Sequence, residues 1–162
     1  MNDKIERTWN INGRPRTVAF APLARLLDVL RDELGLIGLK EGCGEGECGT
    51  CSLILDGELH VSCLVAAAQV DDDAEILTAE GLDEHAMGRA LIDAFDEDGA
   101  VQCGFCSPGM LMGGYALLAS NADPSEEEIR RSLAGNLCRC TGYSRIVEGV
   151  QSAAETLQED QP

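Results

Sequence analysis

Apolar residues alternate with polar ones near the start of the chain. Trp9 and Ile11 fall on one face of an extended segment, and Val18 and Phe20 fall on one face of the next. This period-two spacing is typical of half-buried strands, and the dipeptide Asn12-Gly13 between the two segments is a strong hairpin signal. We therefore predict a β-hairpin with Trp9 in the core.

A helical pattern follows the hairpin. Leucines recur at spacings of three and four residues, at Leu23, Leu26, Leu27, Leu30 and Leu34. Pro22 suits the entry of a helix and Gly35 suits its exit. Further on, two short apolar runs flank Asp56-Gly57, which predicts a second hairpin, and the run at 74–80 predicts another short strand. The first half is thus predicted to be a compact α+β domain.

The second half shows apolar stripes at helical spacing. Helices are predicted in four segments, with Ser107 as an N-cap and Pro108 at the first helical position of the second. Ser125 and Glu128 form a capping box for the third, which stops at Gly135. Four short helices suggest a small bundle. The segments are 85–98, 107–120, 125–135 and 144–157.

Composition limits the function of the chain. The net charge of −17 over 162 residues argues against nucleic-acid binding, which needs clusters of Lys and Arg. The first residues contain no apolar segment of a secretory signal, and no apolar run approaches the length of a membrane span. We therefore expect a cytoplasmic protein. In a reducing compartment, its eight cysteines are expected to bind metal or do redox work.

The cysteines fall into two groups of four, separated by an acidic stretch. A domain boundary is predicted near Gly81, which gives domains 1–80 and 81–162. The first group reads C-x4-C-x2-C with a fourth cysteine eleven residues later, at Cys43, Cys48, Cys51 and Cys63.

This spacing is the plant-type ferredoxin arrangement for a [2Fe–2S] cluster. A loop that wraps a cluster must turn sharply, and glycine permits the positive φ angles this requires. Four glycines are interspersed among these cysteines: Gly42, Gly44, Gly46 and Gly49. Tetrahedral zinc is the alternative, but zinc sites more often pair two C-x2-C units.

The second group reads C-x2-C and, after thirty-one residues, C-x-C. Its members are Cys103, Cys106, Cys138 and Cys140. The first two precede the second predicted helix, and the last two lie between the third and fourth helices. Both pairs can therefore meet at one end of the bundle. The spacing itself leaves both a cluster and a zinc site open.

Three motifs carry a resemblance to a known family: "EGCGEGECGTC" at 41–51, "VQCGFCSPGM" at 101–110 and "LAGNLCRCTGY" at 133–143. From Ile5 to Leu157, the chain resembles the iron–sulfur subunit of the molybdenum hydroxylases, the xanthine dehydrogenase and aldehyde oxidase family. The resemblance implies a β-grasp ferredoxin domain followed by a four-helix bundle, each holding a [2Fe–2S] cluster.

The resemblance also implies roles for single residues. All eight cysteines are implied as cluster ligands, and Gln102 and Cys140 are implied to lie against the pterin of a molybdenum cofactor. Thr50 and Ser107 stand where relatives often carry Ala and Thr, and neither change affects a ligand. No catalytic residue is expected in this chain, which alone should not turn over an organic substrate.

Partners follow from the same resemblance. A large molybdopterin-binding subunit would oxidise the substrate, and electrons would pass through the two clusters to FAD on a medium subunit. The expected assembly is a heterotrimer or its dimer. Purines, N-heterocycles and aldehydes are candidate substrates, with the motif around Cys43 closer to the first two. The alternatives are a free-standing ferredoxin-like shuttle and a zinc-stabilised assembly module.

Overall fold

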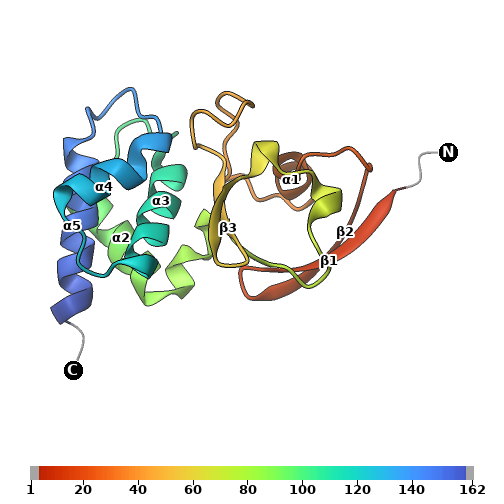
Figure 1. The fold of residues 1–162 in the computed structure, drawn as a ribbon, viewed down its shortest axis with the longest axis horizontal. Coiled ribbons are helices and arrows are strands. Elements are labelled where there is room, and N and C mark those ends of the chain that lie inside the picture. Colours follow the sequence, from red (N-terminus) through yellow and green to blue (C-terminus); the bar gives the residue numbers. More distant parts are fainter. Residues whose placement is uncertain (1–3, 160–162) are drawn as a thin grey trace.

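A small sheet and a group of helices lie side by side in the computed structural model, which describes residues 4–159 (Figure 1). The sheet half contains β1 (Ile5–Ile11), β2 (Arg14–Phe20), α1 (Leu26–Asp28), β3 (Ser52–Leu55), β4 (Glu58–Val61) and β5 (Glu75–Leu77). The helical half contains α2 (Ala86–Glu97), α3 (Ser107–Ser120), α4 (Glu126–Ser132) and α5 (Ser144–Glu159). The coarse prediction of a mixed α+β fold is confirmed.

The sheet has the strand order β2-β1-β5-β3-β4. Both predicted hairpins are present, and β1 pairs with β5 in parallel between them. Asn12 and Gly13 have φ angles of 51° and 72°, and Asp56 and Gly57 have 49° and 87°. Two successive positive φ angles are what a two-residue type I′ hairpin turn requires, so the local turn chemistry determines both hairpins.

The core of the sheet half forms around Trp9. Its ring stacks on that of Phe20 at a centroid distance of 5.5 Å, and both side chains are buried against leucines that follow β2. Leu26, Leu27 and Leu30 are fully buried there. The predicted core role of Trp9 is therefore confirmed.

The predicted helix after β2 is shorter than its leucine pattern suggests. Arg25 has an extended backbone and forms a β-bridge with Ala66. A helix that starts at Pro22 would need a helical backbone at Arg25, so the bridge excludes it. The helix α1 therefore starts only at Leu26 and continues as a π-helical turn over Val29–Glu33. Leu23, predicted on the apolar stripe, is 95% exposed.

The helical half agrees with its predicted segments. The Ser125–Glu128 capping box starts α4, as predicted. Ser107 is not an N-cap: the amide of Ser107 bonds to the carbonyl of Gly104, so the chain already turns before it and Cys106 occupies the cap position of α3. None of the helices between Lys4 and Glu159 is long and apolar enough to cross a membrane.

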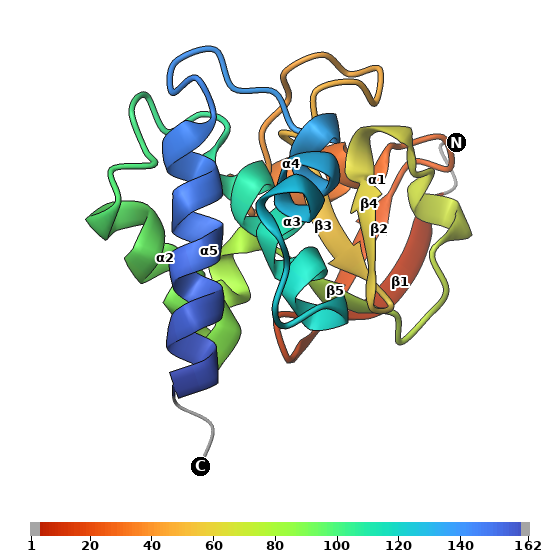
Figure 2. The same cartoon turned by 60° about the vertical axis from the view of Figure 1, so that its left-hand side comes forward.

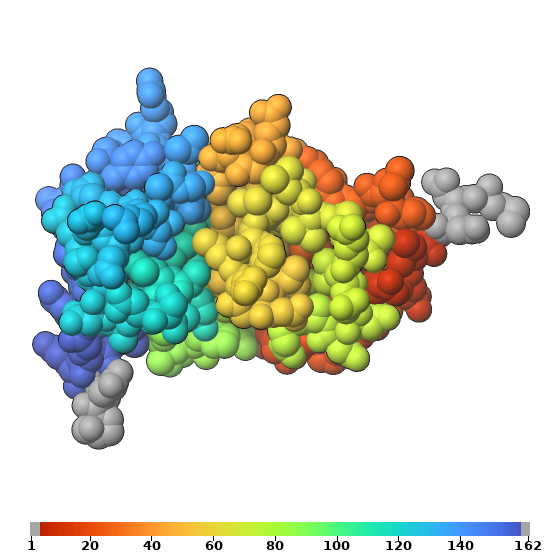
Figure 3. Space-filling view, viewed as in Figure 1, coloured from red at the N-terminus to blue at the C-terminus, as the bar shows by residue number. Residues whose placement is uncertain are grey.

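The two halves are joined by buried apolar contacts. Leu82 and Met112 are fully buried in a small cluster with Ile54 of β3. Leu82 belongs to a 3-10 segment at Ala79–Glu84, which contains the predicted boundary at Gly81. The halves therefore pack directly on one another, as the space-filling view also shows (Figure 3).

Candidate metal centres

The first cysteine group lies mainly in the loop between the π-helical turn and β3. This loop stands out at one edge of the molecule (Figures 1 and 3). Cys43 is exposed and Cys48 is half-buried, while Cys51 and Cys63 are buried. Cys63 comes from the short turn after β4. The first group thus combines one exposed thiol with two buried ones.

Glycines shape this loop as predicted. Gly44, Gly46 and Gly49 have φ angles of 69°, 79° and 67°. Close approach matters too, because a Cβ on Gly46 would lie 2.3 Å from Leu64 and a Cβ on Gly42 would lie 2.8 Å from the Cys48 sulfur. Side chains at these positions would distort the loop around its thiols.

Backbone amides point at the most exposed sulfur of the group. The amides of Glu45 and Glu47 each donate to Cys43 Sγ at 3.4 Å. Hydrogen bonds from the Glu45 amide and from the Cys48 thiol lower the pKa of Cys43 to about 7. Burial, reinforced by the neighbouring Cys51 thiol, raises the pKa of Cys63 to about 11. Cys63 must therefore give up its proton to bind a metal.

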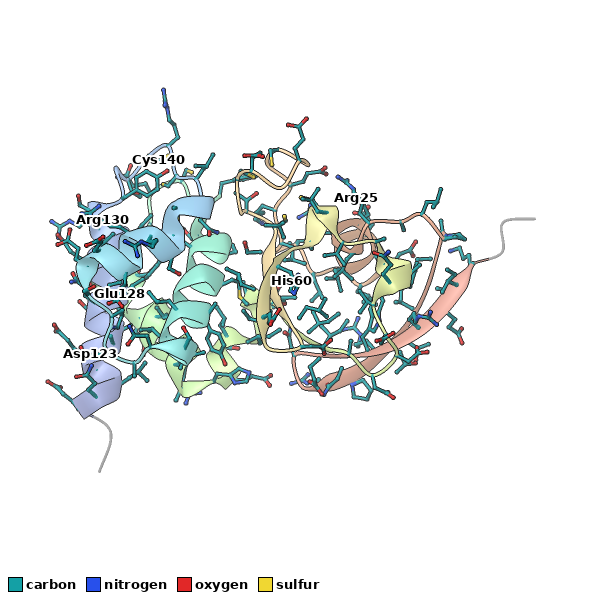
Figure 4. The ribbon with its side chains drawn as sticks, viewed as in Figure 1. Arg25, His60, Asp123, Glu128, Arg130 and Cys140 are labelled. Atoms are coloured by element: carbon teal, nitrogen blue, oxygen red, sulfur yellow. The ribbon has the colours of Figure 1, made fainter. Side chains whose placement is uncertain are left out.

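The second group meets at one end of the helices, as predicted. Cys103 and Cys106 precede α3, and Cys138 and Cys140 follow α4. The loop between α4 and α5 lies at one end of the helices (Figure 2), and Cys140 is labelled there in Figure 4. The Cys140 and Cys103 sulfurs are 3.5 Å apart. Burial, followed by a hydrogen bond with Cys138, raises the pKa of Cys106 to about 12.

Neighbouring thiols interact within each group. The Cys103 and Cys140 sulfurs lie within hydrogen-bonding distance of one another. The pKa of Cys43 is influenced by Cys48, that of Cys63 by Cys51 and that of Cys106 by Cys138. Two thiolates on one tetrahedral metal, with bonds of about 2.3 Å, lie about 3.8 Å apart. Within residues 4–159, no three Cys, His, Asp or Glu side chains are arranged to hold a single metal ion. Four cysteines in each group match the ligand number of a binuclear cluster, whose four cysteines divide between two irons.

A direct link joins the two sites. The amide of Leu137, the residue before Cys138, donates to the carbonyl of Cys48 at 2.9 Å. Beside it, the buried Asn136 side chain donates to the carbonyl of Gly49 at 3.1 Å. A Cβ on Gly109 of α3 would lie 2.4 Å from that same carbonyl. The absence of a side chain there brings α3 close to the first cysteine loop.

Several polar side chains of the sites were not predicted from the sequence. The Thr141 hydroxyl donates to Cys138 Sγ at 3.1 Å, and Thr50 Oγ1 lies 3.3 Å from Cys48 Sγ. The contact of the Asn136 side chain with the first cysteine loop was not predicted either. A polar residue within three positions of a predicted ligand is the only sequence signal that they share.

Gln102 lies at the surface beside Cys103. Gln102, Cys103 and Cys140 are all exposed, and three large apolar side chains near them in sequence are exposed as well. Val101 is 45% exposed, Phe105 47% and Leu137 53%. The end of the molecule that carries the second cysteine group therefore presents apolar side chains next to two thiols.

Two family models of iron–sulfur domains match this chain, one for each cysteine group. The family model described as the 2Fe-2S iron-sulfur cluster binding domain matches residues 9–82. The family model described as the [2Fe-2S] binding domain matches residues 78–151. The chain therefore carries two [2Fe–2S]-binding regions, whose matches overlap at residues 78–82.

Relatives align over nearly the whole chain. The nicotinate dehydrogenase small FeS subunit of Eubacterium barkeri is 46% identical over 153 residues, which covers 94% of this chain and 97% of the relative. The crystal structure of quinoline 2-oxidoreductase from Pseudomonas putida 86 matches with a TM-score of 0.90 at 40% identity, covering 98% of this chain and 99% of that one. The aldehyde oxidoreductase of Desulfovibrio gigas matches with a TM-score of 0.89 at 41% identity, covering 98% of this chain and 18% of that one.

Both family models match consecutive parts of one chain, and the relatives are oxidoreductases or their small iron–sulfur subunits. This chain belongs to the electron-transferring iron–sulfur subunits of the molybdenum hydroxylases, the family of xanthine dehydrogenase and aldehyde oxidase.

Proposed function

We propose that the two cysteine groups hold one [2Fe–2S] cluster each. Cys43 and Cys48 would bind one iron of the first cluster, and Cys51 and Cys63 the other, because Cys43 and Cys48 are the more exposed thiols of the group and Cys51 and Cys63 are both buried. For the second cluster the pairs are Cys103 with Cys140 and Cys106 with Cys138. Bound clusters supply one-electron redox chemistry, while the chain positions their ligands and supplies hydrogen bonds to the sulfurs.

The chain would conduct electrons between the two sites through the hydrogen bond from Leu137 N–H to the Cys48 carbonyl. This contact is the observation that carries the proposal, because it joins a predicted ligand of one site to the neighbour of a predicted ligand of the other at 2.9 Å. Only the two cysteine side chains, a few backbone bonds and one hydrogen bond then separate the clusters.

Electrons would enter at the second site. Cys140 and Gln102 are exposed there among apolar side chains. A glutamine amide offers both a donor and an acceptor to a pterin edge. We propose that this end of the chain docks on a large subunit that carries the molybdenum–pterin cofactor. The first site, in its glycine-rich loop, would pass electrons on to FAD of a medium subunit or to another acceptor.

The assembly would be a heterotrimer or its dimer. It would act in the cytoplasm, because cysteines that bind clusters and form no disulfides are typical of a reducing compartment. In the D. gigas aldehyde oxidoreductase, the matching region makes up 18% of a longer chain. The match to the nicotinate dehydrogenase small FeS subunit, over 97% of its length, favours separate partner subunits for the remaining functions. The names of the nicotinate and quinoline enzymes favour an N-heterocycle as substrate, with purines and aldehydes as alternatives.

At the level of fold, we propose a β-grasp ferredoxin domain at 1–80 and a four-helix bundle at 81–162. Two separate buried cores support this division, one around Trp9 and one around Leu91, Phe95 and Val150. The second domain argues against a free-standing shuttle, which needs only the first. The match of both halves to family models of [2Fe–2S]-binding domains argues against a zinc-stabilised module.

Replacing Gln102 by alanine tests the entry side. We expect Gln102→Ala to keep both clusters and to slow their reduction by substrate at least several-fold in the assembled complex, while reduction by dithionite stays normal. Stopped-flow spectroscopy measures both rates. The control is Gln158→Ala, near the far end of α5, which should leave both unchanged. A substrate-driven rate that stays normal in Gln102→Ala would rule out the assigned entry side.

A further inference from the structure

Threonine hydroxyls contact a cysteine sulfur on each side of the link between the two sites. Thr141 Oγ1 donates to Cys138 Sγ at 3.1 Å, and Thr50 Oγ1 lies 3.3 Å from Cys48 Sγ. Cys48 accepts the linking hydrogen bond through its carbonyl, and Cys138 follows Leu137, which donates it. Both hydroxyls therefore act on the cysteines where the two sites face one another.

The hydrogen of Thr141 is directed at sulfur by a closed ring of hydrogen bonds. The Thr141 oxygen accepts the Tyr143 amide at 3.2 Å, and the Tyr143 hydroxyl accepts the Cys138 amide at 3.0 Å. Tyr143 has a φ of 70°, a left-handed conformation that a bulky residue rarely adopts. Such strain persists where the surroundings enforce it. The ring therefore fixes the orientation of the Thr141 hydroxyl.

The hydrogen of Thr50 is shared. Thr50 is only 5% exposed, and its hydroxyl donates to the Lys40 carbonyl at 3.0 Å while lying within reach of the Cys48 sulfur. A cysteine that binds metal is a thiolate and can only accept a hydrogen bond, so the single hydroxyl hydrogen divides between two acceptors. Thr50 should thus act on its sulfur more weakly than Thr141 does.

We propose that Thr141 and Thr50 raise the reduction potentials of the second and the first cluster, Thr141 by the larger amount. One-electron reduction adds negative charge to a cluster and its thiolates. A hydrogen bond to a more negative sulfur is stronger, so it stabilises the reduced state more than the oxidised state. The inference rests on the proposed cluster ligands. It assigns to both threonines a positioning role that acts through Cys138 and Cys48.

The test is a redox titration of both clusters by EPR in the full-length chain. Thr141→Val keeps the shape of the side chain and removes the hydroxyl. We expect it to weaken the affinity of the second cluster for an electron about fivefold, which is a fall of about 40 mV at 59 mV per factor of ten. The first cluster should be unaffected. Thr50→Val should give a smaller fall at the first cluster only, so each variant is the control of the other.

Thr141→Ser retains a hydroxyl and should restore the wild-type potential, which a purely structural role of Thr141 would not predict. Unchanged potentials in Thr141→Val, or equal shifts in the Ser and Val variants, would overturn the inference. If Thr141→Val fails to bind the second cluster, Thr141→Ala is titrated against Thr141→Ser with the same two outcomes. A wild-type chain with fewer than about four irons would instead contradict the ligand assignment itself.

Discussion

Replacing Cys48 by serine is expected to abolish the first cluster and to leave the second in place. Cys48 would hold one iron of the first cluster together with Cys43, which is exposed. The loop around them is rich in glycine and contributes few side chains to the core, so metal binding contributes directly to its order. The second site lies on helices with a core of their own.

The iron content of Cys48→Ser should fall from about four to about two per chain, with loss of one EPR signal. The matched variant is Cys138→Ser, which should lose the other signal. The isolated Cys48→Ser chain should still accept an electron from dithionite at the second cluster, but the assembled complex should pass almost none onward. Loss of both signals in either variant would show that the two sites do not form independently.

Gly109→Ala is expected to loosen the junction between the two halves. A Cβ on Gly109 would lie 2.4 Å from the Gly49 carbonyl oxygen and 3.1 Å from the Thr50 Cα. Both are backbone atoms and cannot rotate away, so α3 must shift. Overpacking of this kind typically costs about 1–3 kcal/mol in unfolding free energy. The shift would also lengthen the contact between Leu137 and Cys48, which slows transfer between the clusters.

Gly135→Ala is the matched control, because a Cβ there meets nothing within 4 Å. Denaturant unfolding should separate the two variants, with Gly135→Ala close to the wild type. Rapid-mixing reduction of the complex by substrate should show slow reduction of the first cluster in Gly109→Ala alone. If both glycine variants behave alike, the close packing of α3 on the first cysteine loop does not matter for stability or transfer.

Local sequence signals were sufficient to predict the two hairpins and to identify the two cysteine groups. Asn12-Gly13 and Asp56-Gly57 specify turns through their own backbone preferences, and the cysteine spacing reflects ligand chemistry. The start of α1 was not predictable in this way, because it depends on the β-bridge between Arg25 and Ala66, two residues that are far apart in the sequence.

The sequence did not predict the link between the two sites, because that link also joins residues far apart in the chain. Asn136 and Gly49 are 87 positions apart, and neither residue type indicates a partner. Leu137 contributes only its amide, which every residue except proline possesses. Contacts made by the backbone at the junction of two halves leave no pattern in the sequence, although they determine how the two sites are connected.

The proposed function requires that the eight cysteines hold two binuclear iron–sulfur clusters. Determination of iron, acid-labile sulfide and zinc in the anaerobically purified chain tests it most directly. We predict about four irons and about four sulfides per chain, with negligible zinc, and a coloured protein whose visible absorption bleaches with dithionite. Stoichiometric zinc in a colourless protein, or only about two irons per chain, would contradict it.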